Sequence, residues 1–260
     1  MDEDLARRLQ PLEGGINFRD MGGYPAMDGH RVKWGRLYRS GTMSRLTPAD
    51  HAYLAGLGIR CVVDFRSRRE RAREPNRWCA AAGIDYWSRD HQEVFGQLHT
   101  MAKQGIGSEE QAMAIMAEGF RHLPFQQAPA YAELVRRIAD GHVPIAFNCT
   151  AGKDRTGGAA ALVLAILGTP RDTIVADFTL TEQAVDLRKA FGARPEDPSS
   201  PYAGLSEPVM NALAGARPGY IAAFLDAIDE RCGSIEGYLA EIGVPSGAAE
   251  AMRAHLLEPG

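Results

Sequence analysis

Two apolar segments joined by a short polar loop constrain the fold of this chain more than any other feature. The first, residues 143–148 (VPIAFN), has the length and composition of a buried strand. The second, residues 157–167 (GGAAALVLAIL), is long enough for a buried helix. A polar, cationic loop is a poor component of a core, so the junction predicts a strand, a loop and a helix that together hold an anion.

The loop contains the residue types that an oxyanion site needs. Cys149 is expected at the end of the strand and Arg155 at the start of the helix, with Thr150, Ala151, Gly152, Lys153 and Asp154 between them. A loop of this length can turn its N–H groups towards one point at the positive end of a helix, which binds anions without a metal. Gly152 permits a backbone conformation that a side chain would resist. The planar guanidinium of Arg155 matches two oxygens of a tetrahedral oxyanion.

The same environment favours nucleophilic chemistry. A cysteine at a helix N-terminus beside cations commonly has its pKa lowered to roughly 3.5–7.5. We therefore expect Cys149 to attack phosphorus as a thiolate, while Arg155 and the loop amides hold the equatorial oxygens. Thr156 is expected to donate a hydrogen bond to the sulfur, and Lys153 to favour polyanionic substrates. The predicted substrate-binding residues are Thr150, Ala151, Gly152, Lys153 and Thr156.

A general acid must protonate the leaving oxygen and then activate water as a base. Asp154 lies inside the loop and is the first candidate. Asp64 is the alternative, because it ends a predicted strand (residues 59–65) on the sheet edge where α/β sites form. The other interpretation of Asp64 is a structural cap or an ion pair that supports the loop.

Composition limits the partners of the chain. The 260 residues have a formal net charge of −4, so no global basic field favours nucleic acid or an anionic membrane. Four cysteines in a chain of this length do not indicate a disulfide framework, and the seven histidines show no metal-ligand spacing. The charged start lacks the apolar core of a signal peptide, and the longest apolar stretch is too short to span a membrane. We expect a cytoplasmic protein without cofactor, metal or integral membrane segment.

The order of elements indicates the fold class. Strands interleaved with helices predict an α/β fold with a central, mostly parallel sheet flanked by helices, followed by a helical C-terminal part. A helix capped by Thr47 with Pro48 in its first turn, mostly helical structure over residues 89–121 and a continuous helix over residues 172–191 are also expected. The chain is interpreted as a single domain, residues 1–260, in which residues 179–218 form a lid over the loop.

At this point the chain resembles a known family. CTAGKDRTG (residues 149–157) is similar to the signature H-C-x-x-G-K-D-R-T-G of bacterial tyrosine phosphatases sometimes called atypical lipid phosphatases. NFRDMGGY, GRLYRSGTMSRLT, VVDFRSRRE and GSIEGYLAEIGV also resemble this family, in its order. The resemblance implies one cysteine-phosphatase domain acting on phosphotyrosine, in some members also on phosphoserine, phosphothreonine or phosphoinositides. A related mycobacterial phosphatase has a helical lid in the region of residues 179–218. Asn148 departs from the pattern, since the family usually has histidine before the cysteine.

The resulting prediction is a metal-independent phosphomonoesterase that acts through a phosphocysteine intermediate. Its partners would be a phosphorylated protein or a phosphoinositide, with phosphate or another oxyanion in the loop. Two alternatives remain open. Asn148 would fit a phosphoprotein-binding pseudophosphatase, and a catalytic cysteine in a loop also occurs in rhodanese-like sulfurtransferases. The sequence does not indicate an oligomeric state.

Overall fold

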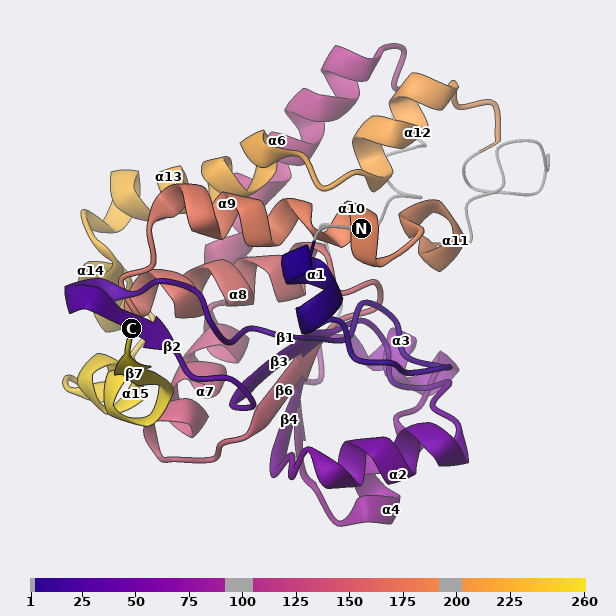
Figure 1. Cartoon of the computed structure of the whole chain (residues 1–260). Helices are drawn as coiled ribbons and strands as arrows, with labels where there is room; N and C mark the ends of the chain where they lie inside the picture. The colour runs from indigo at the N-terminus through magenta and orange to yellow at the C-terminus, as the bar shows by residue number, and fades with distance from the viewer. Residues whose placement is uncertain (1–2, 92–104, 192–202) are drawn as a thin grey trace.

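A five-stranded sheet forms the centre of the computed structural model, which describes residues 3–91, 105–191 and 203–260 (Figure 1). In spatial order its strands are β1 (Arg19–Asp20), β3 (Leu37–Ser40), β6 (Ile145–Asn148), β4 (Cys61–Asp64) and β5 (Asp85–Ser88). All neighbouring pairs are parallel except β1 and β3. Helices flank this sheet, so the predicted α/β class is confirmed.

The register of the parallel strands gathers three chain segments at one edge. Ser40 of β3 and Asp64 of β4 both pair with Asn148 of β6, and each is the last residue of its strand. The segments that follow these three residues therefore leave the same edge of the sheet. This is the edge at which open α/β folds bind ligands.

Side chains along each strand alternate between two cores. Val62 and Ala146 face a smaller cluster with Leu54 and Trp78. Helices α2 (Pro48–Gly56) and α4 (Arg77–Ala82) supply the latter two residues. Val63 and Phe147, each one position further along, face the larger cluster instead. Consecutive side chains of a strand thus point to opposite faces of the sheet, and both faces are buried.

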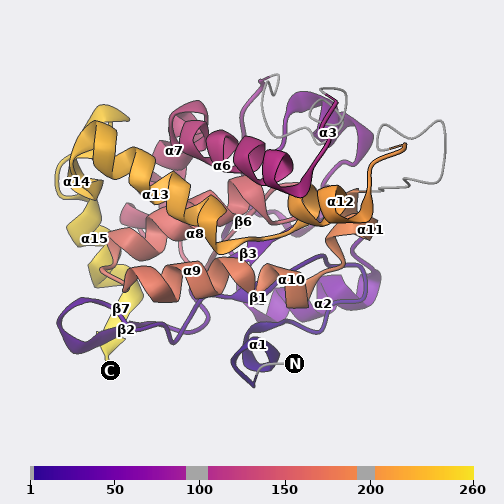
Figure 2. The same ribbon diagram turned by 90° about the horizontal axis from the view of Figure 1, so that it is seen from above.

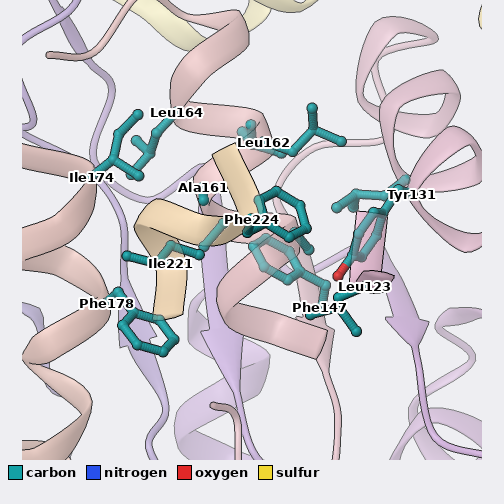
Figure 3. Packing of buried hydrophobic residues seen from close by; sticks show 14 of the residues in the cluster. Leu123, Tyr131, Phe147, Ala161, Leu162, Leu164, Ile174, Phe178, Ile221 and Phe224 are labelled. Carbon is teal, nitrogen blue, oxygen red and sulfur yellow. The ribbon is translucent and has the colours of Figure 1, made fainter. Parts of the chain in front are cut away.

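The larger core lies among α6 (Glu109–Gln126), α7 (Ala128–Ala139), α8 (Asp154–Ile166) and α13 (Pro218–Cys232). Helix α8 is buried almost all round, as its continuous apolar sequence predicts. Figure 3 shows Phe147, Tyr131 and Phe224 packed around it. Seen from above, α9 (Arg171–Thr179), α8, α13 and α6 lie side by side (Figure 2).

The remaining elements lie around these layers. They are α1 (Glu3–Arg8), the short 3₁₀ turn Met27–Gly29, α3 (Arg68–Arg73), α10 (Thr181–Ala184), α11 (Leu187–Phe191), α12 (Glu207–Ala214), α14 (Ile235–Glu241) and α15 (Ala248–Leu256). Strands β2 (His30–Val32) and β7 (Leu257–Pro259) pair antiparallel in a second, two-stranded sheet beside the C-terminus. Within the described ranges, no helix combines the length and apolar character needed to cross a membrane.

Helix boundaries depart from the sequence expectations in two places. The helix predicted over residues 172–191 is broken, because Val185 is extended with φ −153° and ψ 140° between α10 and α11. Of the helical region predicted over residues 89–121, the described part shows a helix only from Glu109 onward, and residues 92–104 lie outside the described residues. The helix at Thr47 is confirmed, with a capping box formed by Thr47 and Asp50.

Close packing at the start of α8 requires glycine. A Cβ atom on Gly158 would lie 2.6 Å from the Tyr131 hydroxyl and 2.8 Å from the Phe224 ring. We expect Gly158→Ala to lower the free energy of unfolding by about 1–2 kcal/mol, since overpacking outweighs the better helix propensity of alanine. Urea denaturation measures this difference. Gly56→Ala is the matched control, because nothing lies within 4 Å of its Cβ, and an equal loss in both variants would contradict the steric argument.

Candidate active site

The loop after β6 has the strand–loop–helix placement that its sequence predicts. Strand β6 ends at Asn148 and helix α8 begins at Asp154, so Cys149 opens the loop and Arg155 stands in the first turn of the helix. Cys149 is buried and reduced, with 3% of its surface exposed. Asn148 is fully buried and donates a hydrogen bond from Nδ2 to the Cys149 carbonyl at 3.3 Å.

Donors from the N-terminal segment bind the outside of the loop. The Thr42 N–H binds the Thr150 carbonyl at 2.9 Å. Asn17 Nδ2 binds the carbonyls of Ala151 and Gly152 at 3.3 and 3.0 Å. In a planar trans peptide the carbonyl and the N–H point in opposite directions. The N–H groups that follow these three carbonyls are therefore turned towards the inner side of the loop, as an anion site requires.

Glycine is required at position 152. Its φ is +72°, and a Cβ atom there would lie 2.7 Å from the Gly41 nitrogen. Arg39 Nη2 also binds the Gly152 carbonyl at 2.9 Å. The tight turn of the loop therefore depends both on glycine and on direct packing against the segment that follows β3.

A buried ion cluster fixes the arginines behind the loop. Asp177 of α9 pairs with Arg39 and lies 3.5 Å from Arg19 Nε, and the Tyr24 hydroxyl donates to it at 3.0 Å. Burial raises the pKa of Asp177, but Arg39 and Arg19 outweigh this and hold it below its usual value. Burial, with Arg39 nearby, lowers the pKa of Arg19 to about 10. Asp177 thereby holds Arg39 in the position from which it binds the Gly152 carbonyl.

Glu70 is a site residue that sequence reasoning missed. Its two carboxylate oxygens accept from Arg155 Nη1 and Nη2, each at 2.8 Å, and the Thr150 hydroxyl donates to it. Burial raises the pKa of Glu70, but the Arg155 guanidinium outweighs this and holds it well below its usual range. Glu70 thereby fixes the plane of the guanidinium. The sequence carried one signal, since Ser67 and Glu70 form a capping box at the start of α3.

The two candidate acids lie in different environments. Asp154 is the first residue of α8 and has 21% of its side chain exposed, with Oδ1 3.3 Å from Lys153 Nζ. Asp64 is fully buried, accepts from Arg66 Nη2 at 2.6 Å and from the Tyr86 hydroxyl at 2.7 Å. Asp64 is thus placed as an internal ion pair, whereas Asp154 has access to the surface beside the loop.

Two expected side-chain contacts are corrected by the structure. The Thr156 hydroxyl donates to the Ser40 carbonyl at 3.3 Å, so its single hydrogen is not directed at the Cys149 sulfur. Lys153 is fully buried, and its ammonium binds backbone carbonyls at the end of α12 at 3.0–3.2 Å. Its side chain is therefore neither solvated nor turned towards a polyanionic substrate, because those carbonyls compete for the same protons.

A second group of polar side chains lies at the opposite edge of the sheet. Possible ligand atoms of Cys61, Asp85 and His142 lie within 4.8 Å of one another. Arg137 already occupies this position, since Nη1 donates to Cys61 Sγ at 3.2 Å and pairs with Asp85. The guanidinium supplies the cation that this cluster needs.

Comparisons with known proteins indicate the family of this chain. Residues 10–258 match the model of the tyrosine phosphatase family. The chain is 34% identical to the triple specificity protein phosphatase PtpB of Mycobacterium tuberculosis over 96% of this chain and 99% of that protein. It is 35% identical to a Cupriavidus necator protein named as a candidate tyrosine-protein phosphatase, over 86% of this chain and 80% of that protein. A tyrosine-protein phosphatase of Nostoc commune is 27% identical over 91% of this chain and 79% of that protein. The chain belongs to the tyrosine phosphatase family.

Proposed function

We propose that this tyrosine phosphatase hydrolyses phosphotyrosine without a metal, through a phosphocysteine at Cys149. The observation that supports this most is the placement of Cys149 and Arg155 at either end of a loop whose carbonyls are bound from outside. The loop amides are thus turned towards the expected place of the phosphoryl oxygens, where negative charge accumulates during transfer, and the Arg155 guanidinium, oriented by Glu70, would act beside them.

In the first step the Cys149 thiolate attacks phosphorus. The S–P bond forms, the P–O bond to the leaving group breaks, and Asp154 gives its proton to the leaving oxygen. In the second step Asp154 takes a proton from water, the resulting oxygen nucleophile attacks phosphorus, and the S–P bond breaks. Inorganic phosphate leaves, and the thiolate and the protonated acid are restored.

The identity of the acid rests on exposure and surroundings. A group that exchanges protons with substrate and water needs access to both, and Asp154, in the first turn of α8, keeps 21% of its side chain exposed. Asp64 is enclosed by Arg66 and Tyr86, which both donate hydrogen bonds to its carboxylate. We therefore assign the acid to Asp154 and a supporting role to Asp64.

A cover over the site is also part of the proposal. Ala151 of the loop packs against Leu187 of α11 and Ala214 of α12. Both views place α10, α11 and α12 together on the side of the molecule that also holds α3 (Figures 1 and 2). The described parts of residues 179–218 thus contact the loop as a lid would, and residues 192–202 lie outside the described residues.

Assays of several phosphorylated substrates test the proposed activity and its specificity. We expect turnover of phosphotyrosine peptides that is unchanged by EDTA, because no step needs a metal. Phosphoserine and phosphothreonine peptides and soluble phosphoinositide headgroups are compared in the same assay, since the relative PtpB is named for triple specificity. Phosphate release measures each rate. Loss of phosphotyrosine turnover on chelation would contradict the proposal, and binding without turnover would indicate a pseudophosphatase instead.

A further inference from the structure

The buried ammonium of Lys153 links the catalytic loop to the end of α12. Its Nζ lies 3.0 Å from the Leu213 and Ala214 carbonyls and 3.2 Å from that of Gly215. The last carbonyls of a helix lack partners within the helix, and a cation is favoured at that end of the dipole. A fully buried charge is costly unless it is paired or hydrogen-bonded, and these carbonyls provide that compensation.

A second contact joins the same two parts of the chain. Ala151, on the other side of Gly152 from Lys153, packs against Leu187 and Ala214. Further along, the Glu182 carboxylate of α10 accepts from the Ala216 N–H at 2.8 Å. The C-terminal end of α12 is thus attached to the loop by the polar contact of Lys153 and the apolar contact of Ala151.

The opposite side of the loop is fixed independently. Asn17 and Arg39 both bind the Gly152 carbonyl, and neither side chain belongs to the segment around α12. The loop is therefore held from two sides, by this frame behind Gly152 and by α12 through Lys153 and Ala151.

We propose that Lys153 is a positioning residue that couples oxyanion binding in the loop to the docking of residues 203–216 on it. The inference rests on the proposed function, because the oxyanion concerned is the phosphoryl group of the substrate. Oxyanion binding favours the loop conformation in which the Lys153 ammonium holds the end of α12. By linkage, a docked α12 strengthens oxyanion binding by the same factor.

The sequence offers a matched pair of lysines for the test. Lys33 also binds carbonyls at the end of a helix, those of Ala254 and His255 in α15, at 3.4 and 3.3 Å. It lies beside the second sheet, since its own N–H binds the Leu256 carbonyl. Methionine keeps the length of lysine and removes its charge and donors, so Lys153→Met and Lys33→Met remove the same kind of contact at two places.

Hydrogen exchange of the ligand-free proteins measures the contact itself. In Lys153→Met we expect the amides of residues 207–216 to exchange about 10- to 100-fold faster than in the wild type, the range expected when hydrogen bonds to a charge are lost. The Gly215 N–H, bonded to the Asn211 carbonyl, and the Ala216 N–H are the reporters. Lys33→Met should leave both unchanged. Equal exchange in Lys153→Met and the wild type would overturn the proposal.

Tungstate, a stable oxyanion, then tests the coupling. In the wild type it should slow exchange across residues 203–216. Tungstate should bind Lys153→Met more weakly than the wild type, and it should not slow exchange of residues 203–216 in that variant. The loss of affinity should equal the factor by which tungstate slows this exchange in the wild type. If exchange is faster in Lys153→Met but tungstate affinity is unchanged, Lys153 only stabilises the end of α12. That result would overturn the proposed coupling to oxyanion binding.

A second variant keeps the test decisive if Lys153→Met does not fold. Leu187→Ala removes the apolar contact with Ala151 and leaves the ammonium in place. It should weaken tungstate binding and tungstate protection together, and a loss of only one of them would overturn the proposal. Failure of tungstate to bind the wild type at all would instead contradict the proposed function, while the ligand-free comparison would still report on Lys153.

Discussion

Replacement of Cys149 by serine is expected to lower kcat for an aryl phosphate by about 10⁴-fold or more, and to leave tungstate binding within a few-fold of the wild type. A serine hydroxyl is not ionised at neutral pH, so the variant lacks the nucleophile. The groups that hold the anion, the loop amides and Arg155, are unchanged. Steady-state kinetics and calorimetric titration with tungstate measure the two quantities.

Cys232→Ser controls for the loss of a thiol as such. Cys232 ends α13, is partly exposed and contacts Glu241, away from the loop. This variant should retain wild-type kcat. A Cys149→Ser enzyme with kcat within tenfold of the wild type would show that another group is the nucleophile.

Asp154→Asn is expected to slow hydrolysis of phenyl phosphate by about 10²–10⁴-fold, and to slow cleavage of an activated nitrophenyl phosphate far less. A poor leaving group needs its oxygen protonated as the P–O bond breaks, whereas nitrophenolate leaves without a proton. Comparison of the P–O cleavage rates of the two esters in single-turnover experiments isolates this step.

Asp64→Asn separates acid catalysis from support of the loop. It removes the charge from a buried pair with Arg66, so we expect a lower Tm and no dependence of the rate loss on the leaving group. If Asp154→Asn instead slowed both esters equally, and Asp64→Asn showed the leaving-group dependence, the two roles would be exchanged.

The junction at residues 143–167 was predictable because its signals are local. An apolar strand, a polar loop with glycine and a continuous apolar helix each stand out within a few residues. The structure confirms the predicted placement of Cys149 after the strand and Arg155 in the first turn of the helix. The same local reading placed the helix start at Thr47, where the capping box is confined to four consecutive residues.

Contacts between distant segments explain what the sequence could not show. Glu70 pairs with Arg155 across 85 positions, so its capping box revealed a helix start but not its partner. Lys153 meets carbonyls 60 to 62 positions further along, and backbone carbonyls carry no residue-specific signal. Likewise, the break at Val185 brings Leu187 into contact with Ala151 and Ala214. The spacing of apolar residues along a helix cannot predict such a tertiary contact.

Detection of a phosphoryl group on Cys149 tests the central claim most directly. Asp154→Asn should still form the intermediate from an activated nitrophenyl phosphate, but it lacks the base that activates water for the second step. The phosphocysteine should therefore accumulate within the first turnover. Rapid quenching followed by peptide mass spectrometry should find the adduct on the peptide that contains Cys149, together with a stoichiometric burst of nitrophenol. A burst without an adduct on Cys149, or an adduct on another residue, would contradict phosphoryl transfer to this cysteine.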